Sequence, residues 1–521
     1  MSEETKEEQV SEPVTEPVQE VTDDGAAVAE QQSPYKGFFG KVDKYFGITK
    51  AKSNYKTEII AGLTTFMTMV YILIVNPSFF SLIPGVSFGA SYIATAIGAI
   101  VGTLLMAFFA RMPLAQASGM GVNAFVVYTL VLNGAGLTYA NAMVFTLLDG
   151  IIFVILTATG LRKQIFNAIP EEVRKAINVG LGLFIAYIGF QNAGFIVNDD
   201  ATLTDIVSFN VLGLNKFVYF DAVAGGFRGM LPALTVILGV IAIAVLAKRN
   251  IKGAILWGIL GSTALYYVLA GIGYACGSEG CKAIFNSIVF DNPFTAFSDW
   301  GVQSAGKVFY EGFDFSGYLA NNSAGQLVLL LVTTALSLCM LDMFDTLGTL
   351  YGACEKGGLL DKDGNPLNMN KCMLSDAIAT CAGAMAGTST VTTFVESSAG
   401  VAAGGKTGFT ALVVGLCFLI AMFLSPIARL IPSAATATAL VWVGVLMMSS
   451  VTKIEWTDPA KALPAFLTVA IMAFGYEISY GIGIGIISSV IVRVCTGKIK
   501  TVSIVTWIIA AFFLATFILT H

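Results

Sequence analysis

The chain has 521 residues, of which 56% are hydrophobic and 12% charged, and its formal net charge is −5. Soluble domains carry about 25% charged residues, so this composition argues against an ordinary soluble enzyme. Residues 1–34 contain ten acidic residues and one lysine, which leaves 24 acidic and 28 basic residues in the rest of the chain. From Glu58 onward, apolar stretches recur with short polar breaks, as in a polytopic membrane protein.

The N-terminal 52 residues differ from the body that follows. Residues 1–34 are rich in Glu, Gln, Val and Pro and contain no aromatic residue. Such a segment cannot bury enough apolar surface to offset the entropy of ordering, so we expect an acidic disordered tail. In residues 35–52, aromatic residues such as Phe38 and Phe39 mix with lysines, which predicts either an amphipathic helix at an anionic membrane surface or a basic linker.

Fourteen apolar segments follow in two sets of seven. The first set lies within residues 53–274 and the second within 324–497, and a long polar loop at 275–323 separates them. The segments are 58–80, 90–110, 113–133, 139–159, 174–194, 231–247, 253–274, 325–350, 372–386, 389–403, 408–425, 434–451, 463–477 and 479–495. The sequence therefore predicts an all-α polytopic membrane protein with about 14 transmembrane segments. A fifteenth run, 502–520 in the C-terminal segment 498–521, either crosses again or lies against the bundle.

The charges between segments set an orientation. The basic residues cluster in alternate connections, at Arg111, Arg162, Lys163, Arg174, Lys175, Lys248, Arg249, Lys252, Lys406, Lys453, Lys461, Arg493, Lys498 and Lys500. The connection 195–229 is acidic instead. By the positive-inside rule, we expect a multi-pass protein of the plasma membrane with a cytoplasmic N-terminus and an outer loop at 275–323.

The two sets of seven resemble each other. The string LTTFMTMVYILIVNP (63–77) can be laid on VTTALSLCMLDMFDT (332–346) without a gap, and LPALTVIL (231–238) resembles LPAFLTVA (463–470). An odd number of crossings per repeat inverts one half relative to the other, as in many transporters. The alternative is two unrelated apolar strings that share Thr and Leu by chance.

Segments 3 and 10 are expected to break the regular helix. The run PLAQASGMGVNAF places Gly119, Gly121 and Asn123 at mid-membrane, and GTSTVTTFVESSAGVAAGG combines β-branched residues with Glu396. Each reads as a short extended stretch followed by a half-helix, and irregular backbone at this depth survives only beside a cavity or buried in protein. Close helix packing is the other explanation for the glycines, but it does not account for Glu396.

Acidic residues inside the membrane are the strongest functional signal. Each costs about 2.5–3.5 kcal/mol at the bilayer centre on insertion scales, so each needs a partner or a function. Asp342 and Asp345 lie three residues apart on one helix face, without a basic residue nearby in their segment. We expect one of them to carry a proton or meet a cation. Asp376 is expected to cap a helix N-terminus, and Asp149 and Glu477 to join helices together.

At this point four strings carry a family resemblance. AGLTTFMTMVYILIVNP (61–77), GMGVNAF (119–125), LDMFDTLGTL (341–350) and TTFVESSAGV (392–401) resemble the signature segments of azaguanine-resistance-type purine permeases, a branch of the nucleobase–cation symporter-2 family. The resemblance spans roughly 55–500 and keeps the order of the motifs. It implies two inverted repeats of seven, with a core domain from segments 1–4 and 8–11 and a gate domain from 5–7 and 12–14.

The resemblance also implies a function. Members of this family take up purine bases such as adenine, guanine, hypoxanthine or xanthine with protons, commonly as homodimers. The family's polar site residues fall on Asn123, Asp345 and Glu396. We therefore expect a secondary transporter that works by alternating access, as the core domain moves against the gate domain.

The chemistry of these residues suits a purine. A carboxylate can accept two N–H donors from one edge of the ring while Asn123 supplies a donor and an acceptor. Phe394 and backbone groups near Val395 could contact the ring. Because burial favours the neutral form of a carboxyl group, Asp342 or Asp345 can load a proton outside and release it inside. Sodium in place of protons stays open, as does the preferred purine.

Other functions have weaker support. A transporter of another small solute or an anion could share the fold, but it would be expected to place basic residues or helix dipoles at its site. An enzyme is not expected, since no acid–base or metal constellation is visible, and the lone histidine is His521. We expect no cofactor, no bound metal and no nucleic-acid partner. Cys276 and Cys281 in the outer loop either form a small disulfide or stay reduced.

Overall fold

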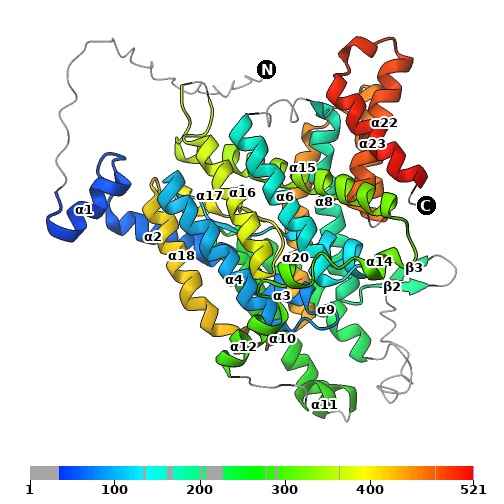
Figure 1. Ribbon diagram of the computed structural model, residues 1–521. Helices are drawn as coiled ribbons and strands as arrows, with labels where there is room; N and C mark the ends of the chain where they lie inside the picture. Colours follow the sequence, from blue (N-terminus) through cyan, green and yellow to red (C-terminus); the bar gives the residue numbers. More distant parts are fainter. Residues whose placement is uncertain are drawn as a thin grey trace, which may run out of the picture.

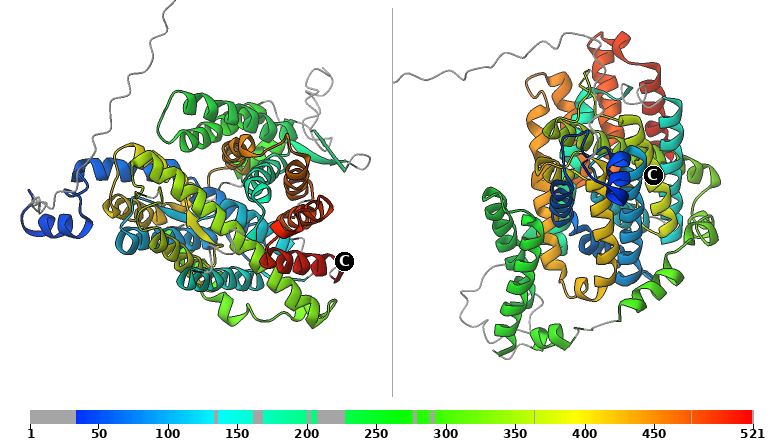
Figure 2. Two further views of the ribbon diagram at one scale, coloured as in Figure 1. Left: turned by 90° about the horizontal axis from the view of Figure 1, so that it is seen from above. Right: turned by 90° about the vertical axis from the view of Figure 1, so that its left-hand side faces the viewer.

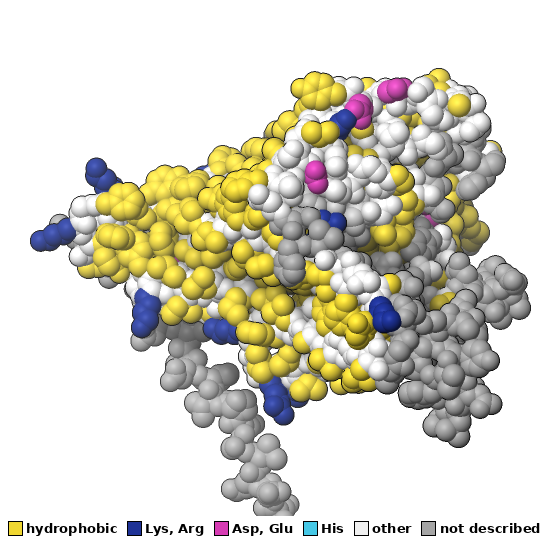
Figure 3. Space-filling model, turned by 90° about the horizontal axis from the view of Figure 1, so that it is seen from below, with side chains coloured by type: hydrophobic (Ala, Val, Ile, Leu, Met, Phe, Trp, Pro, Cys, Tyr) yellow, Lys and Arg dark blue, Asp and Glu magenta, His cyan; other side chains and the backbone are white. Residues whose placement is uncertain are grey.

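The molecule is mostly helical (Figure 1). The computed structural model describes residues 34–132, 136–160, 168–199, 203–206, 227–275, 279–286, 288, 292–362, 364–475 and 477–519. Within these ranges, ten helices are long and apolar enough to cross a membrane. Several turn apolar side chains outward, as Leu238, Ile241 and Val245 do along one stripe of a single helix. Figure 3 shows such side chains over much of one face, and this exposure fits a lipid environment.

The first seven predicted segments all coincide with observed elements. Segment 1 is broken into two helices, and segment 3 is a strand followed by a half-helix. The elements are α2 (Tyr55–Met69), α3 (Ile72–Phe80), α4 (Phe88–Leu105), η1 (Met106–Ala110), β1 (Gln116–Ser118), α5 (Met120–Ala124), η2 (Phe125–Leu132), α6 (Tyr139–Thr159), α8 (Glu171–Asn192), α9 (Phe227–Lys248) and α10 (Ala254–Ala275). A strand hairpin, β2 (Ile196–Asp199) and β3 (Leu203–Ile206), follows α8.

The second seven segments are observed as well. Segment 8 is one long helix, and segment 10 again combines a strand with a half-helix. The elements are α15 (Ala324–Gly357), α16 (Met369–Ala386), β4 (Val391–Thr393), α17 (Ser397–Ala402), α18 (Gly408–Ala421), η3 (Met422–Leu424), α19 (Ser425–Ala428), α20 (Ser433–Met448), η4 (Ser449–Lys453), α21 (Pro459–Phe474) and α22 (Ile478–Cys495). After η5 (Ile499–Thr501), the fifteenth apolar run forms α23 (Ile504–Leu519), which packs against α15 and α22.

Local sequence signals explain where many helices begin. Ser323 and Gln326 form a capping box at the start of α15, and Thr138 and Asn141 form another at the start of α6. These caps satisfy backbone N–H groups that would otherwise lack partners at a helix end.

The helices pack as two bundles that lie side by side (Figure 2). The core bundle contains α2–α6 and α15–α18, and the gate bundle contains α8–α10 and α20–α22. Contacts repeat between the halves: α8 packs on α20 at the centre of the gate bundle, α9 packs on α20 as α21 packs on α8, and α4 packs on α18 as α16 packs on α6. The aligned LPA strings fall on equivalent helices, with Pro232 inside α9 and Pro464 inside α21.

The 275–323 loop contains several short helices. It contains α11 (Glu279–Asn286), α12 (Pro293–Gln303), α13 (Lys307–Tyr310) and α14 (Ser316–Leu319). The indole Nε1 of Trp300 donates to the carbonyl oxygen of Ala386 at 2.8 Å, and the amide Nδ2 of Asn141 donates to the carbonyl oxygens of Gly312 and Asp314. These bonds fix the loop across the ends of α16 and α6. Its outer placement stays a prediction.

The segment 35–52 forms the helix α1 (Gly37–Phe46). It buries Asp43 and Phe46 and leaves Phe38 and Phe39 largely exposed. This arrangement agrees with the amphipathic alternative, while contact with a membrane surface stays a prediction. Three other predictions fall on residues that are not described: the disorder of the tail up to residue 33, the role of Cys276 in a disulfide, and His521.

Candidate functional site

Two short strands, one from each half, meet at the centre of the core bundle. β1 and β4 pair antiparallel, with Gln116 opposite Thr393 and Ser118 opposite Val391. Each strand leads into a half-helix, α5 or α17, as the sequence predicts. Before β4, Gly387 ends α16 with φ +92, and a Cβ there would lie 2.4 Å from the hydroxyl of Tyr139, so only glycine fits.

The alternation of side chains along β4 divides the buried acids into two sets. The hydroxyl of Thr392 donates to Oδ2 of Asp345 at 3.3 Å. The hydroxyl of the next residue, Thr393, donates to Oδ1 of Asp376 at 3.2 Å on the other face of the strand. Asp345 therefore lies on the Thr392 face of the strand, and Asp376 lies behind it on the Thr393 face.

Glu396 stands at the start of α17, where the chain leaves β4. Its carboxylate oxygen Oε1 accepts a hydrogen bond of 2.6 Å from the hydroxyl of Tyr71. Tyr71 is 1% exposed and lies at the junction between α2 and α3. Sequence reasoning missed this residue, because the break in segment 1 carries no glycine and Pro77 lies farther along the chain.

Free space borders the site along the C-terminal half of α15. Asp345 is partly exposed. A Cβ added at Gly348 would have only the Asn178 side chain nearby, at 4.0 Å, and a Cβ added at Gly352 would have no neighbouring atom within 4 Å. These positions follow Asp345 by three and seven residues, so they share its helix face. Val395 is 52% exposed beside Glu396. We call this stretch from Asp345 to Gly352 the access path.

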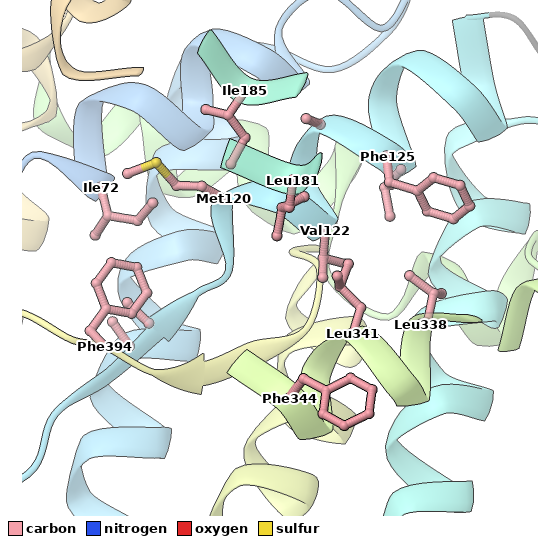
Figure 4. Close-up of a cluster of buried hydrophobic side chains, with 14 of the residues drawn as sticks. Ile72, Met120, Val122, Phe125, Leu181, Ile185, Leu338, Leu341, Phe344 and Phe394 are labelled. Carbon is pink, nitrogen blue, oxygen red and sulfur yellow. The ribbon is translucent and has the colours of Figure 1, made fainter. Parts of the chain in front are cut away.

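Apolar side chains close the opposite side (Figure 4). Leu181 and Ile185 of α8 lie near Met120 and Val122 of α5. A Cβ on Gly121 would lie 2.4 Å from Leu181, so glycine lets the gate bundle approach the half-helix closely. The predicted site residue Phe394 is 7% exposed and lies near Ile72 in the same cluster.

Asn123, another predicted site residue, is fully buried in α5. Its amide oxygen accepts hydrogen bonds from the hydroxyls of Ser118, at 2.8 Å, and Ser389. The Ser118 hydroxyl also lies 2.9 Å from that of Thr388. Asn123 thus ties the two strand regions together, and direct contact with a ligand stays a prediction.

The prediction for Asp376 is wrong. Asn368 is the N-cap of α16, and Asp376 lies two turns inside the helix, fully buried. It accepts hydrogen bonds from the amide Nε2 of Gln116 at 2.9 Å and from the hydroxyl of Thr346 at 2.7 Å, besides that of Thr393. Its partners come from other elements, which local sequence does not show. No group of three His, Cys, Asp or Glu residues within the described ranges is placed to hold a metal ion.

An inverted bundle whose halves each supply a strand and a half-helix to one central region is an architecture found among membrane transporters. Two solved structures share this seven-plus-seven fold. The transmembrane domain of the cyanobacterial bicarbonate transporter BicA matches with a TM-score of 0.53 at 15% identity, over 82% of this chain and 97% of that chain. The murine Solute Carrier 26 family member A9 anion transporter, in its inward-facing state, matches with a TM-score of 0.55 at 13% identity, over 90% of this chain and 74% of that chain.

The sequence comparisons define the family. The model of the permease family, whose members include xanthine and uracil permeases, matches residues 56–484, and the chain belongs to this family. The guanine/hypoxanthine permease PbuO of Bacillus subtilis is 36% identical over 91% of this chain and 100% of its own length. The adenine permease AdeP of Escherichia coli is 34% identical over 91% and 95%. A putative permease of Methanocaldococcus jannaschii is 38% identical over 92% and 98%.

Proposed function

We propose that this chain imports purine nucleobases by proton symport across the plasma membrane, with adenine, guanine, hypoxanthine and xanthine as candidate substrates. The names of the relatives support purines as the substrate class. The observation that carries the proposal is the Glu396 carboxylate, which Tyr71 holds by a hydrogen bond just beyond β4 and within electrostatic range of Asp345. A carboxylate fixed in this way can accept the ring and exocyclic N–H groups along one edge of a purine.

The charges at the site favour a purine over an anion. The segments 113–132, 324–355 and 388–403, which supply Asn123, Asp345 and Glu396, contain no Lys or Arg. An anion placed between Asp345 and Glu396 would meet like charges in a medium of low dielectric, which costs free energy. A neutral purine brings N–H donors and an aromatic face, and in this proposal Phe394 and the backbone near Val395 contact that face.

The two sides of the site suggest the transport cycle. The access path runs toward the end of α15 at Lys356, and the facing helix α8 begins near Arg174 and Lys175. By the positive-inside rule this open side faces the cytoplasm. In the opposite state, the core bundle shifts against the gate bundle, Leu181 and Ile185 part from Met120 and Val122, and the access path closes.

Protons supply the driving force in this proposal. Asp345 borders the access path, and Asp342 lies one turn behind it. A buried carboxyl group favours its neutral form, so it binds a proton when the site faces the side of higher proton activity. Protonation of Asp345 or Asp342, together with a purine at Glu396, favours the movement of the core bundle. Two copies of the chain are proposed to associate as a dimer.

The test is uptake of labelled purines by cells that lack their own permeases. Glu396→Gln and Asp345→Asn are expected to abolish uptake, while Glu355→Gln, an exposed acid at the end of α15, serves as the matched control with uptake retained. Near-normal uptake by both site variants, at wild-type amounts in the membrane, would sink the proposal. Purified protein should be stabilised against heat by purine bases and not by nucleosides, bicarbonate or sulfate; stabilisation by the anions alone would favour the alternative of an anion transporter.

A further inference from the structure

A second set of acids lies behind β4 and takes no part in the purine site. Asp149 of α6, Asp342 of α15 and Asp376 of α16 are each fully buried. We call these three residues the buried acid cluster. They come from three helices that pack on one another in the core bundle.

The three members differ in how well they are bonded. Asp376 accepts hydrogen bonds from Gln116, Thr346 and Thr393. Asp342 accepts one long bond of 3.5 Å from the hydroxyl of Thr380 through Oδ2, and its Oδ1 is buried without a hydrogen-bond partner. Both oxygens of Asp149 are buried without any hydrogen-bond partner. The bonds Thr346–Asp376 and Thr380–Asp342 join successive turns of α15 and α16, so the two carboxyl groups are neighbours. Because burial and a nearby like charge both favour the neutral form, we infer that the Asp342–Asp376 pair holds at least one proton.

Asp149 sits where α6 crosses α15 and α16. A Cβ on the adjacent Gly150 would lie 2.7 Å from the sulfur of Cys381, so the backbones of α6 and α16 touch there. The titratable groups that face Asp149 are Cys339 and Asp342 from α15, and Asp376 and Cys381 from α16.

Within the part of the chain that the structure describes, the stretches of α6, α15 and α16 that meet at this crossing carry no basic side chain. The segment after α13 meets α6 at Ala140 and Val144, more than one turn away from Asp149. The sequence has no Lys, Arg or His within 139–159, 324–355 or 372–386. Asp149 therefore has to be neutralised by a proton rather than by a basic side chain.

A structural role does not explain an acid at this position. A buried polar group without a partner destabilises the fold, and an apolar residue of similar volume would pack better there. The cluster is instead linked to the purine site through β4. Thr392 contacts Asp345 on the site face, while on the other face Thr393 contacts Asp376, and the hydroxyl of Thr380 bridges Asp342 and the backbone of Val391. A shift of β4 when the site fills or empties changes the hydrogen bonds of the cluster.

We propose that Asp149 is a proton-binding residue of the transport cycle and exchanges a proton with the Asp342–Asp376 pair. The exchange begins when the Asp342–Asp376 pair holds two protons and Asp149 is a carboxylate. The O–H bond on Asp342 then breaks and an O–H bond forms on Asp149, so one proton stays on the pair and the cluster's total charge is unchanged by this step. The proton reaches Asp342 from Asp345, one turn away along α15 and beside the access path. This inference rests on the proposed function, because it names a further group that carries the coupling proton.

The experiment compares two assays on the purified protein in vesicles. In counterflow, labelled purine exchanges for unlabelled purine and no net proton movement is needed. In the second assay, a gradient of one pH unit drives accumulation, which one-proton symport can raise to about tenfold. Asp149→Asn and Asp149→Leu are expected to keep counterflow and to lose accumulation. Asp149→Glu keeps the carboxyl group and is expected to restore accumulation, at least in part.

The two neutral variants also separate this role from a structural one. Asp149→Leu removes the unpartnered oxygens at similar volume, so its thermal unfolding temperature is expected to equal or exceed that of the wild type. Wild-type accumulation by Asp149→Leu or Asp149→Asn would overturn the inference, and so would loss of counterflow in both variants. If the wild type itself exchanges purine but accumulates none under the pH gradient, the proposed proton symport fails instead.

Discussion

The hydrogen bond between Tyr71 and Glu396 gives the sharpest test of the site. The change Tyr71→Phe removes the hydroxyl that donates to Oε1 at 2.6 Å and leaves the ring in place. A hydrogen bond to a charged group contributes about 1.5–3 kcal/mol. Because each 1.4 kcal/mol is a factor of ten, the loss corresponds to about 10- to 150-fold in purine affinity if the bond orients the carboxylate for the ligand.

The assay is the concentration dependence of purine uptake. Tyr71→Phe is expected to raise the KM by one to two orders of magnitude, while the maximal rate changes little, since the ligand is held less well but the moving bundles are intact. Tyr92→Phe is the matched control, because Tyr92 is also buried and its hydroxyl donates to the backbone oxygen of Ala421 at 2.7 Å, away from the acids. A KM within twofold of the wild type for Tyr71→Phe would refute the reasoning.

Three further changes test other parts of the account. Gly352→Leu should fold normally, because its Cβ meets open space, and should block uptake by filling the access path. The control is Gly261→Leu on α10, where a Cβ also meets open space, and it should leave uptake unchanged. Equal uptake by both variants would contradict the assignment of the access path. Glu58→Ala should lower the unfolding temperature of the purified protein. The buried Glu58 carboxylate accepts hydrogen bonds from the backbone of Lys406 and from the hydroxyls of Thr407 and Thr410, and each buried donor left without an acceptor costs about 1–3 kcal/mol. An unchanged unfolding temperature would show that these bonds contribute little. Arg493→Ala should also lower the unfolding temperature, because it leaves the Glu172 carboxylate buried without its cation. Lys461→Ala breaks an exposed ion pair with Glu455 and should have little effect. Equal effects of the two changes would contradict the expected difference between a buried and an exposed ion pair.

Much of the fold could be predicted because lipid imposes strong rules on sequence. Apolar length marks the fourteen segments, and the polar residues of segments 3 and 10 mark the places where helix gives way to a strand and a half-helix. The scarcity of charge draws attention to Asp342, Asp345 and Glu396. The lipid environment restricts the residues of each membrane segment separately, so these features can be read from one segment at a time.

Features that depend on contacts between segments could not be predicted in the same way. The break at Val70 and Tyr71 has no glycine or proline at that point, so the partner of Glu396 stayed hidden. Local sequence suggested that Asp376 is a helix cap. Its true role was hidden, because its hydrogen-bond donors are Gln116, Thr346 and Thr393, which lie far away in the sequence. The separation of the acids by the two faces of β4 requires the strand register, which only the folded chain shows.

The most direct test of the central claim is the movement of protons with purine. Vesicles that contain the wild-type protein in a lightly buffered medium should make that medium more alkaline when adenine, guanine, hypoxanthine or xanthine is added outside. Vesicles with Glu396→Gln should give no such change. Purine entry without proton movement, or no entry of any of these purines into vesicles with the folded wild-type protein, would contradict the account.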